Sequence, residues 1–465
     1  MQLKNILNNL PEVQGPIEKK LSFNTKLKWT LIILASFFIL ANIPLYGLAQ
    51  NSLDRFQYLA IILGTDFGSI ISLGIGPIVM ASIILQLLVG SKILDIDTKS
   101  EEGKRYFGGL QKLLVYFFIL FEAAVYVLMN GLQAMPGFTL VVIFQLFLGG
   151  LAIVFMDDLM NKWGFGHGVS LFIVAGVGWR LFAGLFQFMG TQGGNCLLKF
   201  SGTDFIGCPG QVLAALQSVV NGDSMGALIA LATIAVTIII FLVVVWAQSL
   251  KVEIPLSFDR LRGYSIRWPL QFFYASVIPV ILVAALAANL QLFGGLIQNW
   301  MGHATWFGGF SQGRAESGFA FWIAAQHNLL QLGLTGSLAW KYLLQGLTHT
   351  VFYMAFSIIF AVFWVKTSGM DSASQAKNIM GSGLQIPGFR KDERILEAVL
   401  DRYIMPLTVM GGAAIGLLAS IADLMGALTS GTAILLAVMI IYQYYNTIAQ
   451  QHAVDMHPAM KKLMS

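Results

Sequence analysis

Charged side chains are scarce in this 465-residue chain: they make up 11% of its residues, whereas 57% are hydrophobic. A soluble domain carries about 25% charged residues, so the composition excludes an ordinary soluble protein. Catalytic signatures are missing too. The sequence has no phosphate-binding Gly-x-x-x-x-Gly-Lys-Ser/Thr loop and no His-Glu-x-x-His zinc motif, and its six histidines are scattered. We therefore expect no enzyme activity, no cofactor and no metal.

Long apolar runs are abundant, and they indicate a membrane protein. A membrane span needs about 20 apolar residues. Ten candidate spans lie at 29–48, 70–90, 106–130, 138–160, 167–190, 224–250, 270–293, 342–365, 403–423 and 430–450. With the N-terminus inside, 23 of the 28 lysines and arginines fall on the cytoplasmic side, as the positive-inside rule requires. We predict an all-α, multi-pass protein of the cell membrane with both termini cytoplasmic.

The segments outside the spans differ in character. Residues 1–28 carry five lysines and are predicted to form a cytoplasmic amphipathic segment. Two inner loops, 251–268 and 366–402, are long and charged, so they project into water. The outer loop 294–341 is rich in glycine and aromatic residues and is not counted as a further span.

The chain has only two cysteines, Cys196 and Cys208, and both lie in the predicted outer loop 191–223. An outer loop faces an oxidising compartment, where disulfides form. The sequence leaves two states open for these cysteines: a disulfide between them, or two separate thiols.

The second span is interrupted by Gly74, Gly76 and Pro77. Broken helices are tolerated at membrane depth only where the freed backbone faces protein or a water-filled cavity. The seventh span carries Pro279 at the corresponding place, which suggests two inverted halves of five spans, 29–223 and 224–465. Breaks at matched positions of inverted repeats indicate the functional pathway.

Ionisable groups are almost absent from the interior of the predicted spans, and Glu122 is the exception. An ionisable residue inside a membrane is a functional candidate by default. A carboxylate that merely bonds a neighbouring helix is the alternative, and the sequence leaves both open.

Several motifs occur along the chain in the order found in one family of membrane proteins. They are Lys28-Trp29-Thr30, Leu73-Gly74-Ile75-Gly76-Pro77-Ile78-Val79, Gln86-Leu87-Leu88-Val89-Gly90, Val252-Glu253-Ile254-Pro255-Leu256, Ile278-Pro279-Val280-Ile281, Gly388-Phe389-Arg390-Lys391 and Pro406-Leu407-Thr408-Val409-Met410. Essentially the whole chain resembles the SecY family, the channel-forming subunit of the Sec protein translocon, in its archaeal and eukaryotic branch. The resemblance implies ten helices in two inverted halves around a central pore.

The resemblance also implies a ring of apolar side chains that seals the pore. Its members would be Ile75, Val79, Val169, Ile173, Ile281 and Leu436. An aliphatic ring carries no charge that attracts ions, and hydrophobic constrictions can close by dewetting. The chain departs from the family at Val169, where isoleucine is usual, so that ring position is smaller. The neighbouring His167 has no assigned role.

Further regions follow from the same resemblance. The segment at about 52–64 corresponds to a plug that blocks the outer vestibule. A lateral gate toward lipid would lie between spans two and three on one side and seven and eight on the other. The long inner loops would dock ribosomes, because guanidinium groups recognise phosphate. The residues concerned are Asp54, Arg55, Phe56 and Tyr58 for the plug, Gln86, Glu122 and Asn289 for the gate, and Arg260, Arg262, Arg390 and Lys391 for docking.

The function that follows is a protein-conducting channel that moves unfolded polypeptides across the membrane and releases transmembrane segments into lipid. The expected partners are the SecE (gamma) and beta subunits, the ribosome with its RNA, nascent secretory and membrane proteins, and anionic lipids. An inverted-repeat secondary transporter of a small solute is the alternative. Such a transporter places polar or charged ligands near the midplane, where this chain has isoleucine and valine.

Overall fold

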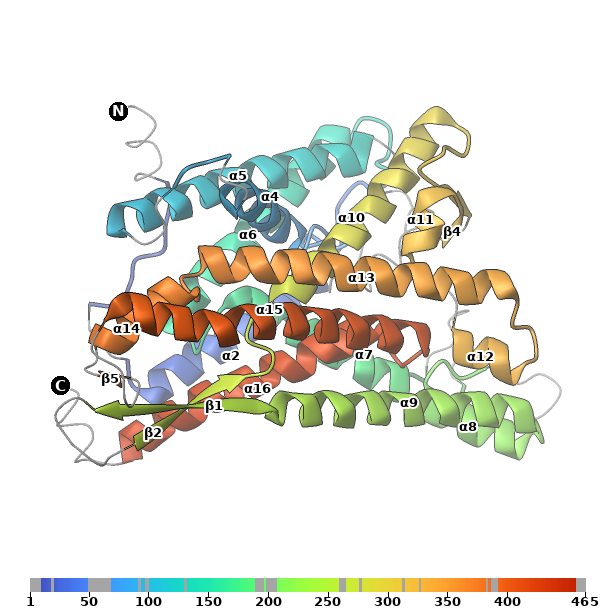
Figure 1. Cartoon of the computed structure of the whole chain (residues 1–465). Helices are drawn as coiled ribbons and strands as arrows, with labels where there is room; N and C mark the ends of the chain where they lie inside the picture. Colours follow the sequence, from blue (N-terminus) through green and yellow to red (C-terminus); the bar gives the residue numbers. More distant parts are fainter. Residues whose placement is uncertain are drawn as a thin grey trace.

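The structure is a computed structural model that describes residues 10–17, 21–48, 68–90, 93–96, 100–128, 132–188, 196–197, 207–258, 265–275, 278–311, 314–325, 328–381, 384–385 and 392–456. Long helices run side by side along one direction and make up most of the molecule (Figure 1). This arrangement confirms the predicted all-α architecture.

Nine helices in the described part of the chain are long and apolar enough to cross a membrane. They are α2 (Phe23–Ala41), α5 (Glu101–Leu128), α6 (Thr139–Trp163), α7 (Gly168–Phe186), α9 (Ser224–Ser249), α10 (Ile278–Met301), α13 (Trp340–Thr367), α15 (Glu393–Leu424) and α16 (Gly431–Met456). The shorter apolar helix α4 (Gly76–Gly90) is the tenth. Each predicted span therefore has its helix, because a bilayer leaves the backbone few other ways to pair its polar groups.

Several predicted span boundaries differ from those of the helices, and for the second and seventh spans the backbone explains the difference. Residues 70–75 of the second span form turns, and the helix begins only at Gly76. The seventh span begins as helix at Ile278, after the strand that ends at Gln271. Pro77 and Pro279 are therefore each the second residue of a helix rather than a break within one. Proline suits a first turn because its missing N–H would have no partner there.

One end of the bundle, called here the β1 end, lies to the left in Figure 1 and carries the strands β1 and β2. The predicted inner loop 251–268 is not irregular: β1 (Lys251–Phe258) pairs antiparallel with β2 (Ser265–Gln271), in the register Lys251 to Gln271. The short strand β5 (Leu384–Gln385) pairs with the other edge of β1, at Ser257 and Phe258. Helix α14 (Ser372–Gly381) packs nearby against α15.

The opposite end, called here the α8 end, carries the remaining short elements. They are α8 (Gln211–Val220), β3 (Gly309–Ser311), β4 (Arg314–Ser317), α11 (Gly318–Ile323) and α12 (Leu329–Leu334). Of the two states left open for the cysteines, the structure contains the Cys196–Cys208 disulfide, which lies just before α8.

The N-terminal segment is fastened to the β1 end by ionic contacts. Glu12 pairs with Lys112 of α5 and Lys162 of α6. The Val13 N–H donates to Asp158 at 2.8 Å, and Lys162 also pairs with Asp158 at 3.3 Å. The hydrogen bond from Lys112 holds the pKa of Glu12 below its usual value.

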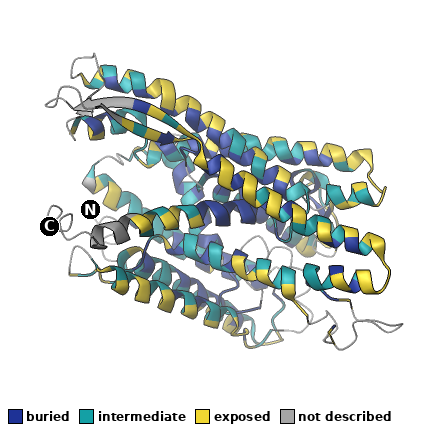
Figure 2. Ribbon diagram, turned by 90° about the horizontal axis from the view of Figure 1, so that it is seen from below, coloured by how far each residue is buried: buried dark blue, intermediate teal, exposed yellow. Residues whose placement is uncertain are grey.

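Buried residues gather between the helices, whereas exposed residues follow the outward faces of the helices (Figure 2). One large apolar cluster joins α4, α7, α9, α10, α13, α15 and α16. A second cluster joins α4, α5 and α6 to α10 through Ala288, Leu292 and Leu296. Helix α10 is the most deeply buried of the nine long helices and packs against both clusters.

Gly149 of α6 allows the turn before α4 to lie directly against that helix. A Cβ added at Gly149 would stand 1.9 Å from the carbonyl oxygen of Ile70. Such a collision with backbone cannot be relieved by a side-chain rotation, so the turn would have to move away from α6.

We expect Gly149→Ala to destabilise the folded protein by about 1–3 kcal/mol, the usual cost of overpacking a core. The measurement is the thermal unfolding midpoint of the purified protein in detergent. Gly178→Ala in α7 is the matched control, because a Cβ there meets no atom within 4 Å. Equal midpoints for the two variants would contradict the close approach of Ile70.

Candidate functional site

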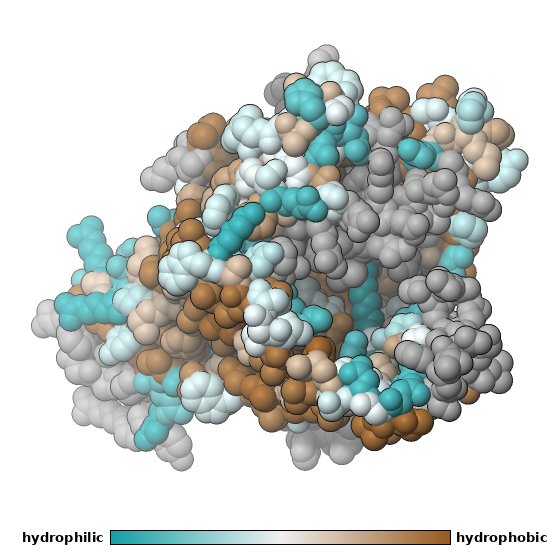
Figure 3. Space-filling view, turned by 90° about the vertical axis from the view of Figure 1, so that its right-hand side faces the viewer, coloured by the Kyte–Doolittle hydropathy of each residue, from teal (hydrophilic) through white to brown (hydrophobic). Residues whose placement is uncertain are grey.

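A cavity of about 600 Å³ opens among α4, α7, α10, α13, α15 and α16. Seen from the α8 end, the molecule is hollowed near the centre of its face, with hydrophilic side chains scattered around and hydrophobic ones gathered along the lower left flank (Figure 3). The cavity thus lies at the meeting point of the two halves of the chain.

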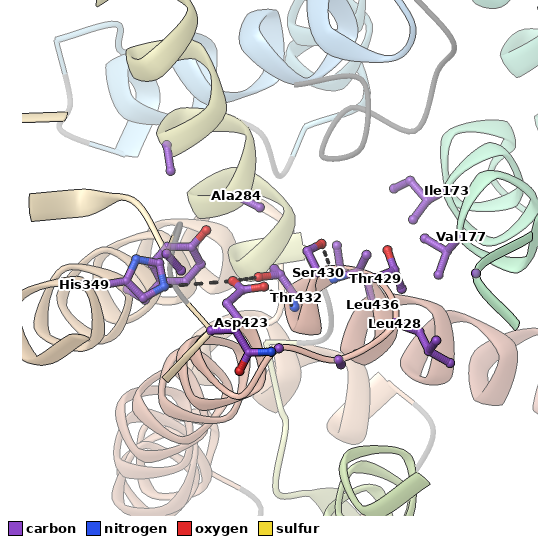
Figure 4. A pocket seen from close by; sticks show the side chains of 18 of the residues that line it. Ile173, Val177, Ala284, His349, Asp423, Leu428, Thr429, Ser430, Thr432 and Leu436 are labelled. Atoms are coloured by element: carbon purple, nitrogen blue, oxygen red, sulfur yellow. Dashed lines mark hydrogen bonds and ion pairs between the residues drawn. The ribbon is translucent and has the colours of Figure 1, made fainter. Parts of the chain in front are cut away.

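Five of the six residues predicted to form the apolar ring line this cavity. They are Ile75, Val79, Ile173, Ile281 and Leu436. The sixth, Val169, is absent from its lining, but it packs on the same apolar cluster as the other five. Ile173 and Val177 of α7 lie across the cavity from Leu436 of α16 (Figure 4). Residues far apart in the sequence therefore meet at one apolar place.

The cavity also has a polar wall that the sequence analysis missed. His349 of α13 and Asp423 of α15 face each other there, with 3.9 Å between Nε2 and Oδ2 (Figure 4). Only 2% of the His349 side chain and 9% of the Asp423 side chain are exposed. Glu122 is therefore not the single ionisable exception within the spans. A scan for ionisable residues would have found each of them alone, since the predicted span 342–365 contains His349 and the predicted span 403–423 contains Asp423, but it would not have paired them.

His349 is held in place by its other ring nitrogen. Its Nδ1 lies 2.7 Å from the carbonyl oxygen of Ile323 in α11. A carbonyl oxygen only accepts, so Nδ1 carries the hydrogen in this contact. The ring also lies 4.4 Å from that of Tyr353, one turn further along α13. Nε2 is thereby directed toward Asp423.

The three polar residues predicted at the lateral gate are all buried. Gln86 of α4 and Glu122 of α5 each have one side-chain oxygen without a hydrogen-bond partner among the described residues. The Asn289 amide of α10 donates to Ala285 of its own helix at 2.8 Å. Helix α4 packs against α5, α10 and α13, so Gln86 and Asn289 belong to neighbouring helices, while no hydrogen bond between them is present.

Glu122 lies over the start of α4. Its Oε2 would be 3.2 Å from a Cβ added at Gly76, the first residue of that helix. A carboxylate is favourable at the N-terminus of a helix because the unpaired N–H groups there carry partial positive charge. Glu122 of α5 therefore lies beside Gly76, the residue that follows Ile75.

The residues predicted for the plug and for ribosome docking lie outside the described residues. The first group is Asp54, Arg55, Phe56 and Tyr58, and the second is Arg260, Arg262, Arg390 and Lys391. Arg260 and Arg262 follow β1 and precede β2, and Arg390 and Lys391 follow β5. The three strands form one sheet. The strands that flank the two predicted docking segments in the sequence therefore belong to the same sheet.

His167 is located at the start of α7. Its carbonyl oxygen accepts a hydrogen bond of 2.7 Å from the Tyr444 hydroxyl of α16. This contact uses the backbone of His167 and leaves the role of its imidazole unassigned. His167 is not among the residues that line the cavity.

A bundle of helices long enough to span a membrane, around a cavity that is lined in part by aliphatic side chains, defines a membrane channel. Comparison with known proteins gives its family. The family model described as SecY matches residues 69–445, and the model described as the plug domain of Sec61p matches residues 37–68. The chain belongs to the SecY family.

Similar proteins extend over nearly the whole chain. The protein translocase subunit SecY of Methanothermobacter thermautotrophicus is 41% identical over 98% of this chain and 96% of its own length. That of Haloferax volcanii is 39% identical over 98% and 97%. A solved structure of a protein-conducting channel has a TM-score of 0.83 at 35% identity, and it covers 98% of both chains. Sec61 in the canine ribosome–channel complex from the endoplasmic reticulum has a TM-score of 0.79 at 35% identity over the same shares.

The chain is accordingly a multi-pass membrane protein that forms a protein-conducting channel, and it is not an enzyme. The transporter alternative has no support among these relatives. The predicted family and fold are confirmed.

Proposed function

We propose that a translocating polypeptide passes through a ring of six aliphatic side chains, those of Ile75, Val79, Val169, Ile173, Ile281 and Leu436. In the resting channel, these side chains pack against one another and close the passage. One observation carries this proposal: six aliphatic residues from four separate segments pack in a single cluster beside the central cavity. Aliphatic side chains offer no fixed ligand to an ion, and a narrow apolar passage expels water.

The plug and the gate complete this proposal. The segment at about 52–64 would close the vestibule outside the ring, in keeping with the match of residues 37–68 to a plug domain. The lateral gate is the seam that has α4 and α5 on one side and α10 and α13 on the other. These two sides would separate to let apolar segments reach lipid. Buried polar groups in that seam, Gln86 and Glu122 with their unpaired oxygens, make the closed state less stable than a fully apolar seam would be.

The partners and the orientation rest on charge and on the relatives. A ribosome would dock on Arg260, Arg262, Arg390 and Lys391, and one similar structure is of Sec61 in a ribosome–channel complex. SecE and beta subunits and anionic lipids would lie against the exposed apolar faces and lysines. The protein would lie in the cell membrane, with its halves at 29–223 and 224–465. Both termini would be cytoplasmic, because this orientation places most lysines and arginines on the inner side.

The ring is tested by removing two of its side chains. We expect Ile75→Gly with Ile281→Gly to raise the resting ion conductance, because the constriction loses two aliphatic groups. The measurement is planar-bilayer conductance of the reconstituted channel without substrate. Ile239→Gly with Ile359→Gly is the control, since both of these side chains are exposed on the outside of the helix bundle. A conductance equal to that of the control would remove Ile75 and Ile281 from the ring.

Ribosome docking is tested by reversing one charge. We expect Arg390→Glu to weaken ribosome binding and to lower the salt dependence of log K by about one unit of slope, the share of one phosphate contact. Binding is measured by co-sedimentation across a salt series. Lys341→Glu makes the same charge change at the α8 end and should leave the slope unaltered. If the slope for Arg390→Glu is unaltered as well, Arg390 makes no phosphate contact and contributes only to the orientation of the protein in the membrane.

The gate is tested by making its seam apolar. We expect Gln86→Leu with Asn289→Leu to favour the closed seam and to raise the hydrophobicity that a segment needs to enter lipid. The effect should be about 0.6–2 kcal/mol, the range for one polar contact in a membrane. Model helices of graded leucine content measure the threshold, with Ser36→Leu of α2 as the control. If the double variant inserts the same helices as the parent, these two residues do not tune the gate.

A further inference from the structure

Helix α16 starts in direct contact with the backbone of α15. A Cβ added at Gly431, its first residue, would stand 2.0 Å from the carbonyl carbon of Ala422. The Thr432 N–H donates to Asp423 Oδ1 at 3.0 Å, and the Thr432 hydroxyl bonds to Oδ2 (Figure 4). The first-turn N–H groups of a helix have no partner within it, and the Asp423 carboxylate supplies one here.

Helix α7 starts in the same way against α6. A Cβ added at Gly168, its first residue, would stand 2.6 Å from the Cα of Asp157. The Val169 N–H donates to Asp157 Oδ1 at 2.9 Å. In both pairs, a glycine lets two helix backbones touch, and an aspartate of the preceding helix accepts the N–H that follows the glycine.

The two arrangements occupy corresponding places in the two halves. Helices α6 and α7 close the first half, and α15 and α16 close the second. The starts of α7 and α16 point in opposite directions along the α7–α16 pair. Gly184, late in α7, is near Leu428 before α16, and Tyr444, midway along α16, contacts His167 before α7. Inverted halves require this antiparallel relation.

The number of residues from the first residue of each helix to its ring residue is also the same. Ile173 is the fifth residue after Gly168, and Leu436 is the fifth residue after Gly431. Residues at i and i+4 share one face of a helix, so Leu436 stands on the face of Thr432, and Ile173 on that of Val169. Fixing the first turn therefore fixes the direction of the ring side chain one turn later.

We propose that Asp157 and Asp423 are equivalent positioning residues, which hold the first turns of α7 and α16 so that Ile173 and Leu436 point into the constriction. The inference rests on the proposed function only where it calls that constriction the seal. Asp157 is absent from the lining of the cavity, whereas Asp423 forms part of its polar wall, so the positioning role of Asp423 is additional to its place in that wall. Each acts only on the ring members of one helix, because each is bonded to the start of one ring-bearing helix: Asp157 on Val169 and Ile173, and Asp423 on Leu436.

The test measures the exposure of a single reporter thiol in the closed channel. Cys196 and Cys208 are joined by a disulfide, so Ile173→Cys or Leu436→Cys introduces the reactive group. Asp157→Ala should raise the rate of maleimide modification at position 173 about fivefold, the factor that corresponds to about 1 kcal/mol for one lost helix cap. It should leave position 436 unchanged. Asp423→Ala should do the reverse.

The chain offers a matched control for each aspartate. Asp158→Ala removes the neighbouring carboxylate of α6, which bonds Val13 and Lys162 rather than α7. Ser420→Ala removes a buried bond between Thr350 and α15 without touching α16. Neither control should alter either rate. If an alanine variant does not fold, Asp157→Asn and Asp423→Asn keep one acceptor oxygen each, and smaller rises with the same selectivity are expected.

Equal rises at both positions, or none, would overturn the inference, since the first indicates general loosening and the second indicates no positioning. Resting conductance separates this outcome from a failure of the proposed seal. If Ile173→Gly and Leu436→Gly do not increase conductance while the thiol rates still respond selectively, the aspartates position these side chains but the side chains do not seal the pore.

Discussion

Backbone N–H groups at the helix starts around the cavity must be paired without help from water, and the structure meets this constraint in two ways. Helices α4 and α10 carry proline as their second residue, at Pro77 and Pro279, so one donor is removed outright. Helices α7 and α16 keep the donor and give it to an aspartate of the preceding helix. Corresponding helices of the two halves use the same solution.

This constraint explains how an apolar constriction can be both tight and deformable. The helix starts are fixed by backbone contact and by paired donors, whereas the ring itself is made of aliphatic side chains that have no directional bonds. Such side chains can separate and close again at little cost beyond their packing. The polar wall with His349 and Asp423 lies beside the ring, so the cavity changes from polar to apolar over a short distance.

Hydropathy predicted the ten spans because each helix must cover the bilayer with apolar residues, and family motifs predicted a ring whose six members do pack in one cluster. The sequence could not place the start of α10, because an apolar strand and an apolar helix read alike over the residues before Ile278. The β1–β2 pair was missed because the charged residues of 251–268 indicated a loop, although Lys251 and Glu253 alternate with apolar residues as in a strand. His349 and Asp423 are 74 positions apart in the sequence, so no local pattern reveals the contact between them.

The central claim is that a polypeptide crosses through the ring, and site-specific photo-crosslinking to a stalled secretory chain tests it most directly. A photoreactive amino acid at Val79 or Leu436 should crosslink to the chain in transit. The same amino acid at Leu140, which is 80% exposed on the outside of α6, should crosslink to lipid instead. Crosslinks to the stalled chain from Leu140 but not from Val79 or Leu436 would contradict the account.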